Sequence, residues 1–317
     1  MLKRGFQPRR TLYFAFGHDE EIGGLQGAKP LAETLALRGI KPAFILDEGG
    51  YVLQGIIPGY SGQVAIINTA EKGYATIKLR AETAGGHSAF SPKANPIGIV
   101  SQALVRLENH PYGPRMPRAT QETLEYLAPE MPFSKGIFLA NLWFFKPLVL
   151  RQYARNRTTE ILVRTTMSET MFNSGVKDNV VPASAVATLN VRLLPGDTVD
   201  ALLDHLRAAI DDTRVKIEAV NAYSAPPESS SDSEAFRQIA RSVRETFHGA
   251  IVVPGLLAGA TDSRHYSGLG APIYRFVPME VGPADVARAH GINERLSVSN
   301  YIRAVEFYGQ LIQNSSN

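Results

Sequence analysis

A pattern that occurs twice near the N-terminus constrains the fold of this chain more than any other feature of its sequence. Each copy has a short apolar run, then carboxylates, then two glycines: TLYFAFGHDEEIGG at residues 11–24 and PAFILDEGG at residues 42–50. Short apolar runs that end in polar or glycine residues are typical of buried strands. We therefore predict buried strands at residues 12–16 and 42–46.

A helix is expected between the two strands, because residues 28–38 have helical periodicity and Gly39 follows as a stop signal. A strand–helix–strand unit brings the carboxyl ends of parallel strands to one edge of the sheet, where ligands bind in open α/β folds. Glu20, Glu21 and Asp47 are therefore expected to converge. Such crowded carboxylates need a compensating cation or a shared proton. The alternative is a solvated acidic loop.

The candidate metal ligands are Glu21, Asp47 and His290. Carboxylate and imidazole groups suit Zn²⁺ and related divalent ions. Glu20 cannot share one strand face with Glu21, and a carboxylate beside a metal-bound water is a natural general base. For His290 the alternative is a structural or surface histidine.

Three residues in the middle of the chain are further candidates. His87 lies in a Gly-Gly-His-Ser loop and can donate a hydrogen bond to a developing oxyanion, although a solvated loop histidine is an equal alternative. Arg192 lies in an alternating strand, and Asn179 precedes that strand. The two are expected to fix a substrate carboxylate, because arginine binds carboxylates bidentately. An ordinary exposed arginine is the alternative.

The periodicity of the chain predicts three blocks. Residues 72–222 contain alternating strands and amphipathic helices, which indicates an α+β domain with a single antiparallel sheet. Residues 1–71 and 223–317 both have the βα pattern and are expected to form one α/β domain. Residues 252–261 are rich in glycine and are expected to be a connection, followed later by a final helix at 300–312.

Composition excludes several classes of protein. The net charge of +3 is small and no basic face is visible, so nucleic acid is not an expected partner. Without cysteine the chain has no disulfide or thiolate metal site. The apolar residues 136–150 are too few to span a bilayer as one helix. Residues 1–10 have no apolar core of a secretory signal, so the cytoplasm is the default expectation for the chain as written.

With these residues laid out, the sequence resembles the M20 metallopeptidase family, and within it the carboxypeptidase S-like branch, which includes N-acyl-amino-acid hydrolases. The resemblance rests on GHDEEIGG, ILDEGG, GGHSA, NVVPASAVATLNVR, GATDSR and AHGINERLSV, which follow one another in the family order over residues 10–298. It implies a zinc-exopeptidase-like α/β catalytic domain with an inserted α+β (ferredoxin-like) lid domain that often dimerises. It also implies two divalent metals, usually zinc, and a peptide or N-acyl amino acid as substrate.

The resemblance assigns roles to seven residues of this chain: the general base Glu20, the metal ligands Glu21, Asp47 and His290, the oxyanion donor His87, and the carboxylate-binding Asn179 and Arg192. By the same resemblance, Glu21 and His290 bind one metal and Asp47 binds the other. His87 is expected to act across a homodimer formed through the lid domain. The predicted reaction is metal-dependent cleavage of an amide bond next to a free carboxylate.

One departure from the family pattern changes these expectations. The family has an upstream His-x-Asp motif and an aspartate that bridges both metals, and this sequence has neither. Residues 1–5 also look like the last turn of a helix. We therefore expect a truncated gene product or fragment whose catalytic domain is incomplete at the N-terminus, with one metal or weak metal binding and poor activity. The alternative function is a non-catalytic dimerisation or scaffold fragment with a vestigial metal half-site.

The apolar residues 138–150, which include Trp143, Phe144 and Phe145, allow one further hypothesis. They are candidates to line a site for a long acyl chain. The alternative is that they form the core of the lid domain.

Overall fold

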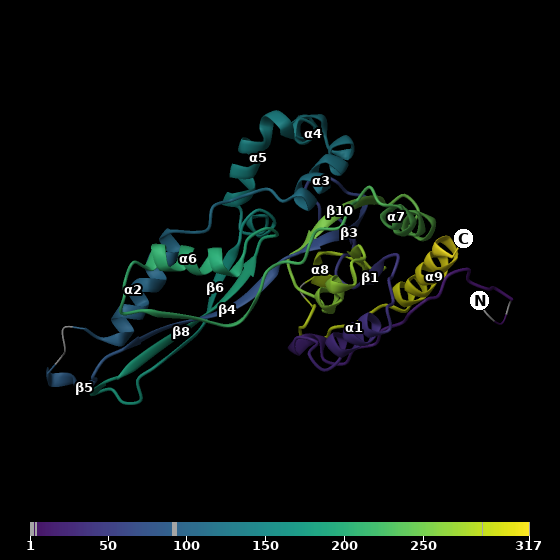
Figure 1. The fold of residues 1–317 in the computed structure, drawn as a ribbon. Coiled ribbons are helices and arrows are strands. Elements are labelled where there is room, and N and C mark those ends of the chain that lie inside the picture. The colour runs from purple at the N-terminus through teal and green to yellow at the C-terminus, as the bar shows by residue number, and fades with distance from the viewer. Residues whose placement is uncertain (1–2, 4, 91–93, 287, 317) are drawn as a thin grey trace. The chain divides into compact units, whose positions relative to one another are not determined.

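The computed structural model describes residues 3, 5–90, 94–286 and 288–316 (Figure 1). The chain divides into two compact units. Unit 1 comprises residues 1–71, 118–149 and 226–317, and unit 2 comprises residues 72–117 and 150–225. Residues 118–149, which the sequence analysis placed in the middle block, therefore group with the first and last parts of the chain. The helix end expected at residues 1–5 falls mainly on residues outside the described ones.

Unit 1 contains a mixed sheet and the helices around it. Its strands are β1 (Ile45–Asp47), β2 (Val52–Gln54), β3 (Gln63–Glu71), β10 (Ile251–Leu257), β11 (Ile273–Arg275) and β12 (Glu280–Val281). Its helices and helical turns are η2 (Glu20–Ile22), α1 (Ala28–Leu37), α3 (Arg118–Leu127), η4 (Ala128–Glu130), α4 (Phe133–Ala140), α7 (Glu234–Thr246), η6 (Asp262–Leu269), α8 (Pro283–Val286) and α9 (Val298–Ser315). Helix α5 (Leu142–Arg155) continues from residues of unit 1 into residues of unit 2.

Strand β3 is the centre of the unit 1 sheet. The strand order is β1-β11-β3-β2-β12, and β10 pairs in parallel with β3. Every residue of β3 is at least half-buried, as expected for a strand with neighbours on both sides. Helices α7 and α9 cover this sheet through a core that includes Ile67, Ile239, Tyr274 and Phe307.

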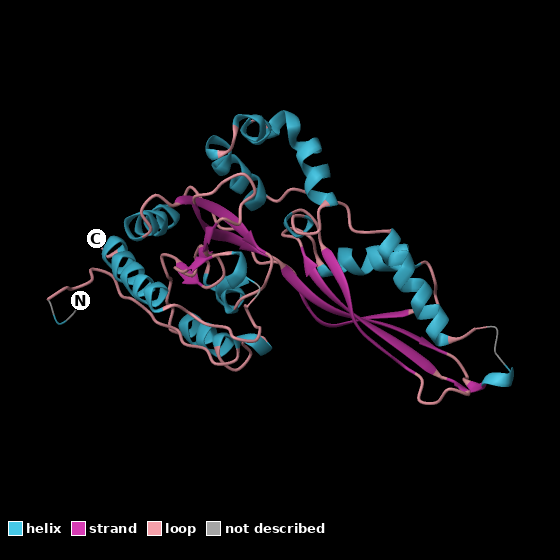
Figure 2. Cartoon of the chain, turned by 180° about the vertical axis from the view of Figure 1, so that it is seen from behind, coloured by secondary structure: helices cyan, strands magenta, loops and turns pink. Residues whose placement is uncertain are grey.

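The buried strand expected at residues 12–16 is wrong. This segment forms no strand before α1 (Figure 2). Its aromatic side chains are exposed, with 68% of Phe14 and 84% of Phe16 accessible to solvent. A strand is stable only with a ladder partner, and none of the strands in the described sheet pairs with residues 12–16. An apolar run is therefore not sufficient to form a strand when no neighbouring strand forms hydrogen bonds with it.

Two strands of the unit 1 sheet were not predicted from the sequence. Strand β3 was not predicted, and β10 was expected to be a connection because its sequence, IVVPGLL, contains proline and glycine. In β10, Pro254 is tolerated because this strand pairs only with β3 and keeps one edge free of ladder bonds within the described residues. Gly255 is required because a Cβ there would lie 2.3 Å from the side chain of Ile66.

Unit 2 is an α+β unit with a four-stranded antiparallel sheet and a separate two-stranded one. Its elements are β4 (Gly73–Glu82), β5 (Gly86–His87), η3 (Ser88–Phe90), α2 (Pro96–Asn109), η5 (Glu160–Leu162), β6 (Thr166–Ser174), β7 (Val180–Val181), β8 (Ser184–Leu193), α6 (Val199–Ile210) and β9 (Lys216–Tyr223). The main sheet has the order β6-β8-β4-β9, and the chain order of its strands and helices is β-α-β-β-α-β.

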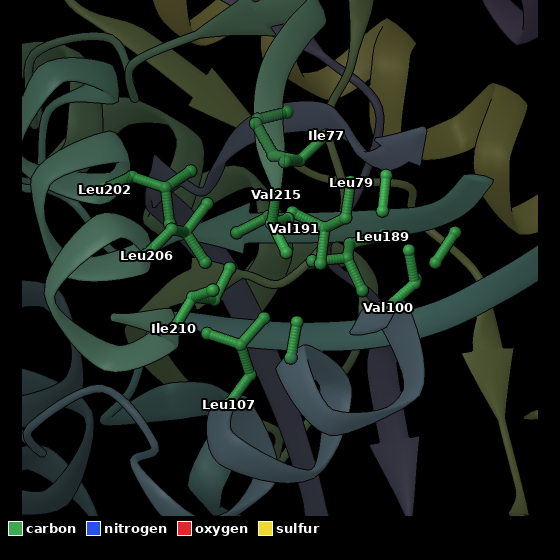
Figure 3. Close-up of a cluster of buried hydrophobic side chains, with 14 of the residues drawn as sticks. Ile77, Leu79, Val100, Leu107, Leu189, Val191, Leu202, Leu206, Ile210 and Val215 are labelled. Carbon is green, nitrogen blue, oxygen red and sulfur yellow. The ribbon is translucent and has the colours of Figure 1, made fainter. Parts of the chain in front are cut away.

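The core of unit 2 lies on one face of this sheet. Alternate residues of β4 and β8 are fully buried, which is the period-2 pattern that the sequence predicted. They pack against the apolar faces of α2 and α6, as Figure 3 shows for Ile77, Leu189 and Leu206. The opposite face of the sheet carries the polar residues of the same strands.

Helices α4 and α5 form a bent pair in the described part of the chain. The break between them turns the helix direction by 111°. No single described helix is long and apolar enough to cross a bilayer, and these two reach that threshold only when they are taken together.

Candidate active site

Glu20 and Glu21 lie in the short helical turn η2 rather than at the end of a strand. The carbonyl oxygen of Asp19 accepts hydrogen bonds from the backbone N–H of Ile22 and of Gly24, at 3.2 and 2.8 Å. Successive side chains of a 3₁₀ turn point about 120° apart, so the two carboxylates still diverge. The divergence of Glu20 and Glu21 stays a prediction, and it follows from a turn rather than from a strand.

The second copy of the sequence pattern places Asp47 at the end of β1. Its strand partner in β11 is Arg275. The Oδ2 atom of Asp47 is buried and has no hydrogen-bond partner among the described residues. The same is true of Asp19 Oδ1 and Asp262 Oδ1. Buried carboxylate oxygens normally have a partner, and a cation is one group that can compensate such an oxygen.

Asp262 is brought beside the first pattern by two glycines. A Cβ at Gly24 would lie 2.0 Å from Asp262 Oδ1, and a Cβ at Gly17 would lie 3.0 Å from Asp262 Oδ2. Asp262 is the first residue of the helical turn η6. The next residues of η6 hold the turn at residues 23–24 in place. Arg264 Nη2 and His265 Nε2 donate to the carbonyl oxygen of Gly23, at 2.6 and 2.9 Å.

His290 lies beside Glu21, with Nδ1 3.5 Å from Oε1. Both side chains are about three-quarters exposed, at 76% and 74%. His290 has a positive φ of 55°, which is uncommon for a non-glycine residue. Two of the three candidate metal ligands are thus neighbours, although they are far apart in the sequence.

The crowding of carboxylates changes their acidity. Loss of hydration, followed by the charges of Glu48, Glu21 and Asp262, raises the pKa of Glu20 to about 7. The same kind of desolvation raises the pKa of Glu48, with the charge of Asp47 as the next cause. For Asp262 too, burial and then the charge of Asp47 raise the pKa.

The donor chemistry of this group suits a divalent metal, because it combines carboxylate oxygens without hydrogen-bond partners and an imidazole. The number of donors is low. In the described ranges, no three histidine, aspartate or glutamate side chains gather closely enough to hold a metal ion. The chain therefore provides the pair Glu21 and His290, and Asp47 separately.

A buried ion pair stabilises the backbone that carries Asp262. Arg275 and Glu71 are each 1% exposed, and their side chains meet at 3.1 Å. Glu71 Oε2 also accepts hydrogen bonds from the backbone N–H and the hydroxyl of Thr261, at 3.0 and 3.1 Å. Because the hydroxyl of Thr261 caps η6, this pair fixes the point from which Asp262 extends.

His87 and Asn179 lie together at one end of the unit 2 sheet. The backbone N–H of Ser88 donates to the carbonyl oxygen of Asn179 at 3.1 Å, and β5 pairs with β7. The side chain of His87 is exposed, and the Ala89 N–H donates to its Nδ1 at 3.1 Å. That hydrogen bond favours the tautomer in which Nε2 carries the proton and is free to donate.

Arg192 lies at the other end of the same sheet. It is paired with Tyr74, and its guanidinium lies over the ring of Tyr74 at 4.9 Å. Ser184 is at the end of β8 that follows Asn179 in the sequence, and Arg192 is eight residues further along this strand. Eight strand residues correspond to roughly 26 Å. One amino-acid carboxylate therefore cannot contact Asn179 and Arg192 of the same chain.

Two residues of the carboxylate cluster were not among the expected site residues, namely Glu48 and Asp262. For Glu48 the signal was its position beside Asp47 in the second glycine-flanked pattern. For Asp262 the signal was the TDSR sequence in a glycine-flanked loop. Neither signal gives the distance to Glu20, which depends on the packing of η6 against the glycine turn.

Comparisons with known proteins agree with this arrangement. The sequence profile of the peptidase family M20/M25/M40 matches residues 1–314. The N-fatty-acyl-amino acid synthase/hydrolase PM20D1.1 of Danio rerio is 41% identical over 322 residues, which cover 99% of this chain and 62% of the relative. Probable carboxypeptidase S-like 2 of Dictyostelium discoideum is 39% identical over 318 residues, which cover 99% and 61%. The chain thus spans less than two thirds of the length of these relatives.

Solved structures show the same fold. The M20 family metallo-carboxypeptidase Sso-CP2 from Sulfolobus solfataricus has a TM-score of 0.65 at 17% identity, covering 93% of this chain and 68% of that chain. Human carnosine dipeptidase 1 has a TM-score of 0.58 at 12% identity, covering 94% and 65%. The profile match and the curated relatives show that the chain belongs to the M20/M25/M40 family of metallopeptidases, in the branch of N-acyl-amino-acid hydrolases and carboxypeptidase S-like proteins.

Proposed function

We propose that this chain provides part of the catalytic site of a metal-dependent hydrolase that cleaves an amide bond next to a free carboxylate. The observation that carries the proposal is the approach of Glu21 and His290 to 3.5 Å, beside a general-base candidate, Glu20. The substrate class is a peptide C-terminus or an N-acyl amino acid. The second class is favoured by the printed name of the Danio rerio relative, an N-fatty-acyl-amino acid synthase/hydrolase.

Glu20 is the proposed general base. A group accepts a proton efficiently near neutral pH when its pKa is close to that pH, and the pKa of Glu20 is raised to about 7. Its neighbours Glu21, Glu48 and Asp262 keep it in a negative field that favours proton uptake from water. Glu20 is therefore suited to take a proton from the attacking water and to return it to the leaving amine.

Glu21 and His290 would hold one divalent ion, and Asp47 would contribute to a second. When bound, such an ion supplies Lewis-acid chemistry, polarising a carbonyl and making water more acidic. We propose zinc as the ion. Because the described residues contain no group of three donors, we propose that the 317 residues alone bind one ion weakly and turn over substrate slowly.

Unit 2 is proposed to act as a lid and dimerisation domain. His87 and Asn179 share one end of its sheet, where the Nε2 proton of His87 can be donated to an oxyanion. Arg192 lies at the other end of this sheet, which supports a site to which two copies of the chain contribute different residues. We propose that His87 and Asn179 of one protomer serve the site of its partner, and that Arg192 binds the substrate carboxylate within its own protomer.

The proposal is tested by assaying the 317-residue chain with excess Zn²⁺ on N-acyl amino acids and dipeptides. We expect slow turnover that chelation removes, that Glu20→Gln abolishes, and that the exposed Glu33→Gln leaves unchanged. Turnover that survives Glu20→Gln would refute the assigned base. Long-acyl and acetyl substrates are compared in the same assay, and equal rates for both would refute a preference for fatty acyl groups.

A second candidate function is a non-catalytic dimerisation or scaffold fragment with a vestigial metal half-site. It is favoured by the absence of a three-donor group among the described residues. Both candidates form a dimer, so sedimentation velocity is combined with the turnover assay to separate them. A dimer with no zinc-dependent turnover on either substrate class would favour the scaffold.

A further inference from the structure

Helices α4 and α5 carry a continuous apolar surface that the proposed hydrolase chemistry does not use. We call it the α4–α5 face, and it consists of Phe133, Ile137, Phe138, Trp143, Phe144 and Leu148. Each of these side chains is exposed, from 37% for Phe138 to 85% for Phe133. Single exposed apolar residues are common, but a cluster of this size marks an interaction surface.

The α4–α5 face is held in place from its opposite side. Leu142 and Val149 of α5 are buried, at 2% and 8% exposure. Gly136 of α4 is also buried, and a Cβ there would lie 2.7 Å from the carbonyl oxygen of Ala128. The exposed face is therefore the outer side of two anchored helices, so the expectation that this segment forms the core of a lid domain does not hold for its exposed residues.

Aromatic contacts make the face continuous across the break between the two helices. The ring centroids of Phe138 and Phe145 are 4.7 Å apart, and those of Phe144 and Phe145 are 4.9 Å apart. The ring of Trp143 continues the series, 5.6 Å from that of Phe144. The bend of 111° does not suit a straight span across a bilayer. It suits helices that lie in the plane of an interface.

The positive charge around the α4–α5 face indicates an anionic partner. Residues 131–159 contain five lysine and arginine residues and no aspartate or glutamate. On α5, Arg151 and Arg155 follow Phe144 by seven and eleven positions, so they lie on the same helix side as Phe144 and Leu148. An apolar, aromatic stripe that continues into cations is complementary to an anionic lipid surface.

We propose that the α4–α5 face docks this protein on an anionic phospholipid surface. The aromatic side chains enter the headgroup region, and Arg151 and Arg155 contact lipid phosphates. Neither helix crosses the bilayer. The inference rests on the exposed face and its charge, and it is independent of the catalytic proposal.

The chain contains one tryptophan, Trp143, which is part of the face and reports on it directly. Titration of the 317-residue chain with vesicles of phosphatidylcholine and phosphatidylglycerol (about 7:3) is expected to shift the emission of Trp143 to the blue and to protect it from acrylamide. Vesicles of pure phosphatidylcholine are expected to bind at least about tenfold more weakly. The emission shift requires no turnover, so its failure is distinguishable from failure of the hydrolase proposal.

Two matched pairs of variants complete the test. Phe133→Ser with Leu148→Ser is expected to lower vesicle binding at least about tenfold through the loss of two apolar contacts, whereas the pair Phe90→Ser with Leu37→Ser, which is at least as exposed, is not. Arg151→Glu with Arg155→Glu is expected to abolish binding, whereas the same charge change at Arg38 and Lys41 leaves it within about twofold.

Three results would overturn the proposal. The first is an unchanged Trp143 emission in anionic vesicles. The second is a Trp143 that is already shielded from acrylamide without lipid, which would mean that another protein surface or a second copy covers the face. The third is a shift caused by a monomeric N-acyl amino acid and not by vesicles, which would assign the face to single acyl chains.

Discussion

At the residue scale, the site depends on glycines that allow backbone and carboxylates to approach closely. Gly24 has a φ of 66° and lies against Asp262, so no side chain fits there. The sequence revealed this glycine pair and the carboxylates beside it. It also led to His290 as a partner of Glu21, but through the family resemblance, because no local pattern joins these residues. The approach of Asp262 to Glu20 was not predicted, since its contact with Gly24 is a tertiary one.

The first prediction concerns Gly24→Ala. A Cβ there would lie 2.0 Å from Asp262 Oδ1, and the positive φ adds backbone strain, so we expect a loss of about 2–4 kcal/mol in the free energy of unfolding. Gly39→Ala is the matched control, because Gly39 has the same φ of 66° with nothing within 4 Å of the added Cβ. Urea titrations of both variants measure the difference. Equal losses would contradict the contact with Asp262.

The second prediction concerns Lys72, which is fully buried and whose Nζ donates to the carbonyl oxygen of Arg164 at 2.8 Å. Burial, with the charge of Arg192 as the next cause, lowers its pKa from 10.5 to about 8. Between these values the unfolded chain holds the proton that the folded chain has released. The contribution of Lys72 to the free energy of unfolding is therefore lowest below pH 8 and rises as the pH rises towards 10.5.

Lys72→Met removes this pH dependence. Relative to the variant, the wild-type chain is expected to gain on the order of 3 kcal/mol in the free energy of unfolding between pH 8 and 10.5. The exposed Lys29→Met serves as control and is expected to show no such change. A wild-type advantage that stays flat across this pH range would show that Lys72 remains charged in its buried position.

At the scale of elements, the buried pair Glu71–Arg275 joins β3, β11 and the start of η6. Sequence periodicity identified α1 and the strands β4 and β8 because their local patterns match their tertiary environment. It failed for residues 12–16, whose apolar pattern lacks a ladder partner, and for β10, whose proline and glycine are tolerated at an edge. Strand formation depends on the neighbours across the sheet, and a local pattern does not contain them.

The third prediction concerns Glu71→Gln. Removing this charge leaves Arg275 buried without a counterion, so we expect a loss of about 3–5 kcal/mol in the free energy of unfolding. Glu82→Gln breaks an exposed pair with Lys216 and is expected to leave the free energy of unfolding nearly unchanged, because solvent screens this pair. The double variant Glu71→Gln with Arg275→Met is expected to recover part of the loss. A cost for Glu71→Gln no larger than that of Glu82→Gln would contradict the role of this pair.

At the scale of the whole molecule, the chain consists of two units of which only unit 1 contains metal-ligand candidates. The β-α-β-β-α-β order of unit 2 follows the sequence prediction of an α+β block with one antiparallel sheet. The family resemblance predicted the M20 identity, which the profile match over residues 1–314 confirms. The roles of the individual site residues stay predictions.

The central claim is that Glu21 and His290 hold the same metal ion. It is tested most directly by calorimetric titration of the 317-residue chain with Zn²⁺, alongside Glu21→Gln, His290→Ala and the control His248→Ala, an exposed histidine that follows helix α7. We predict one weak site, lowered in affinity by at least about tenfold (~1.4 kcal/mol) in each of the first two variants and unchanged in His248→Ala. Two tight sites, or one site that His290→Ala leaves intact, would contradict the account.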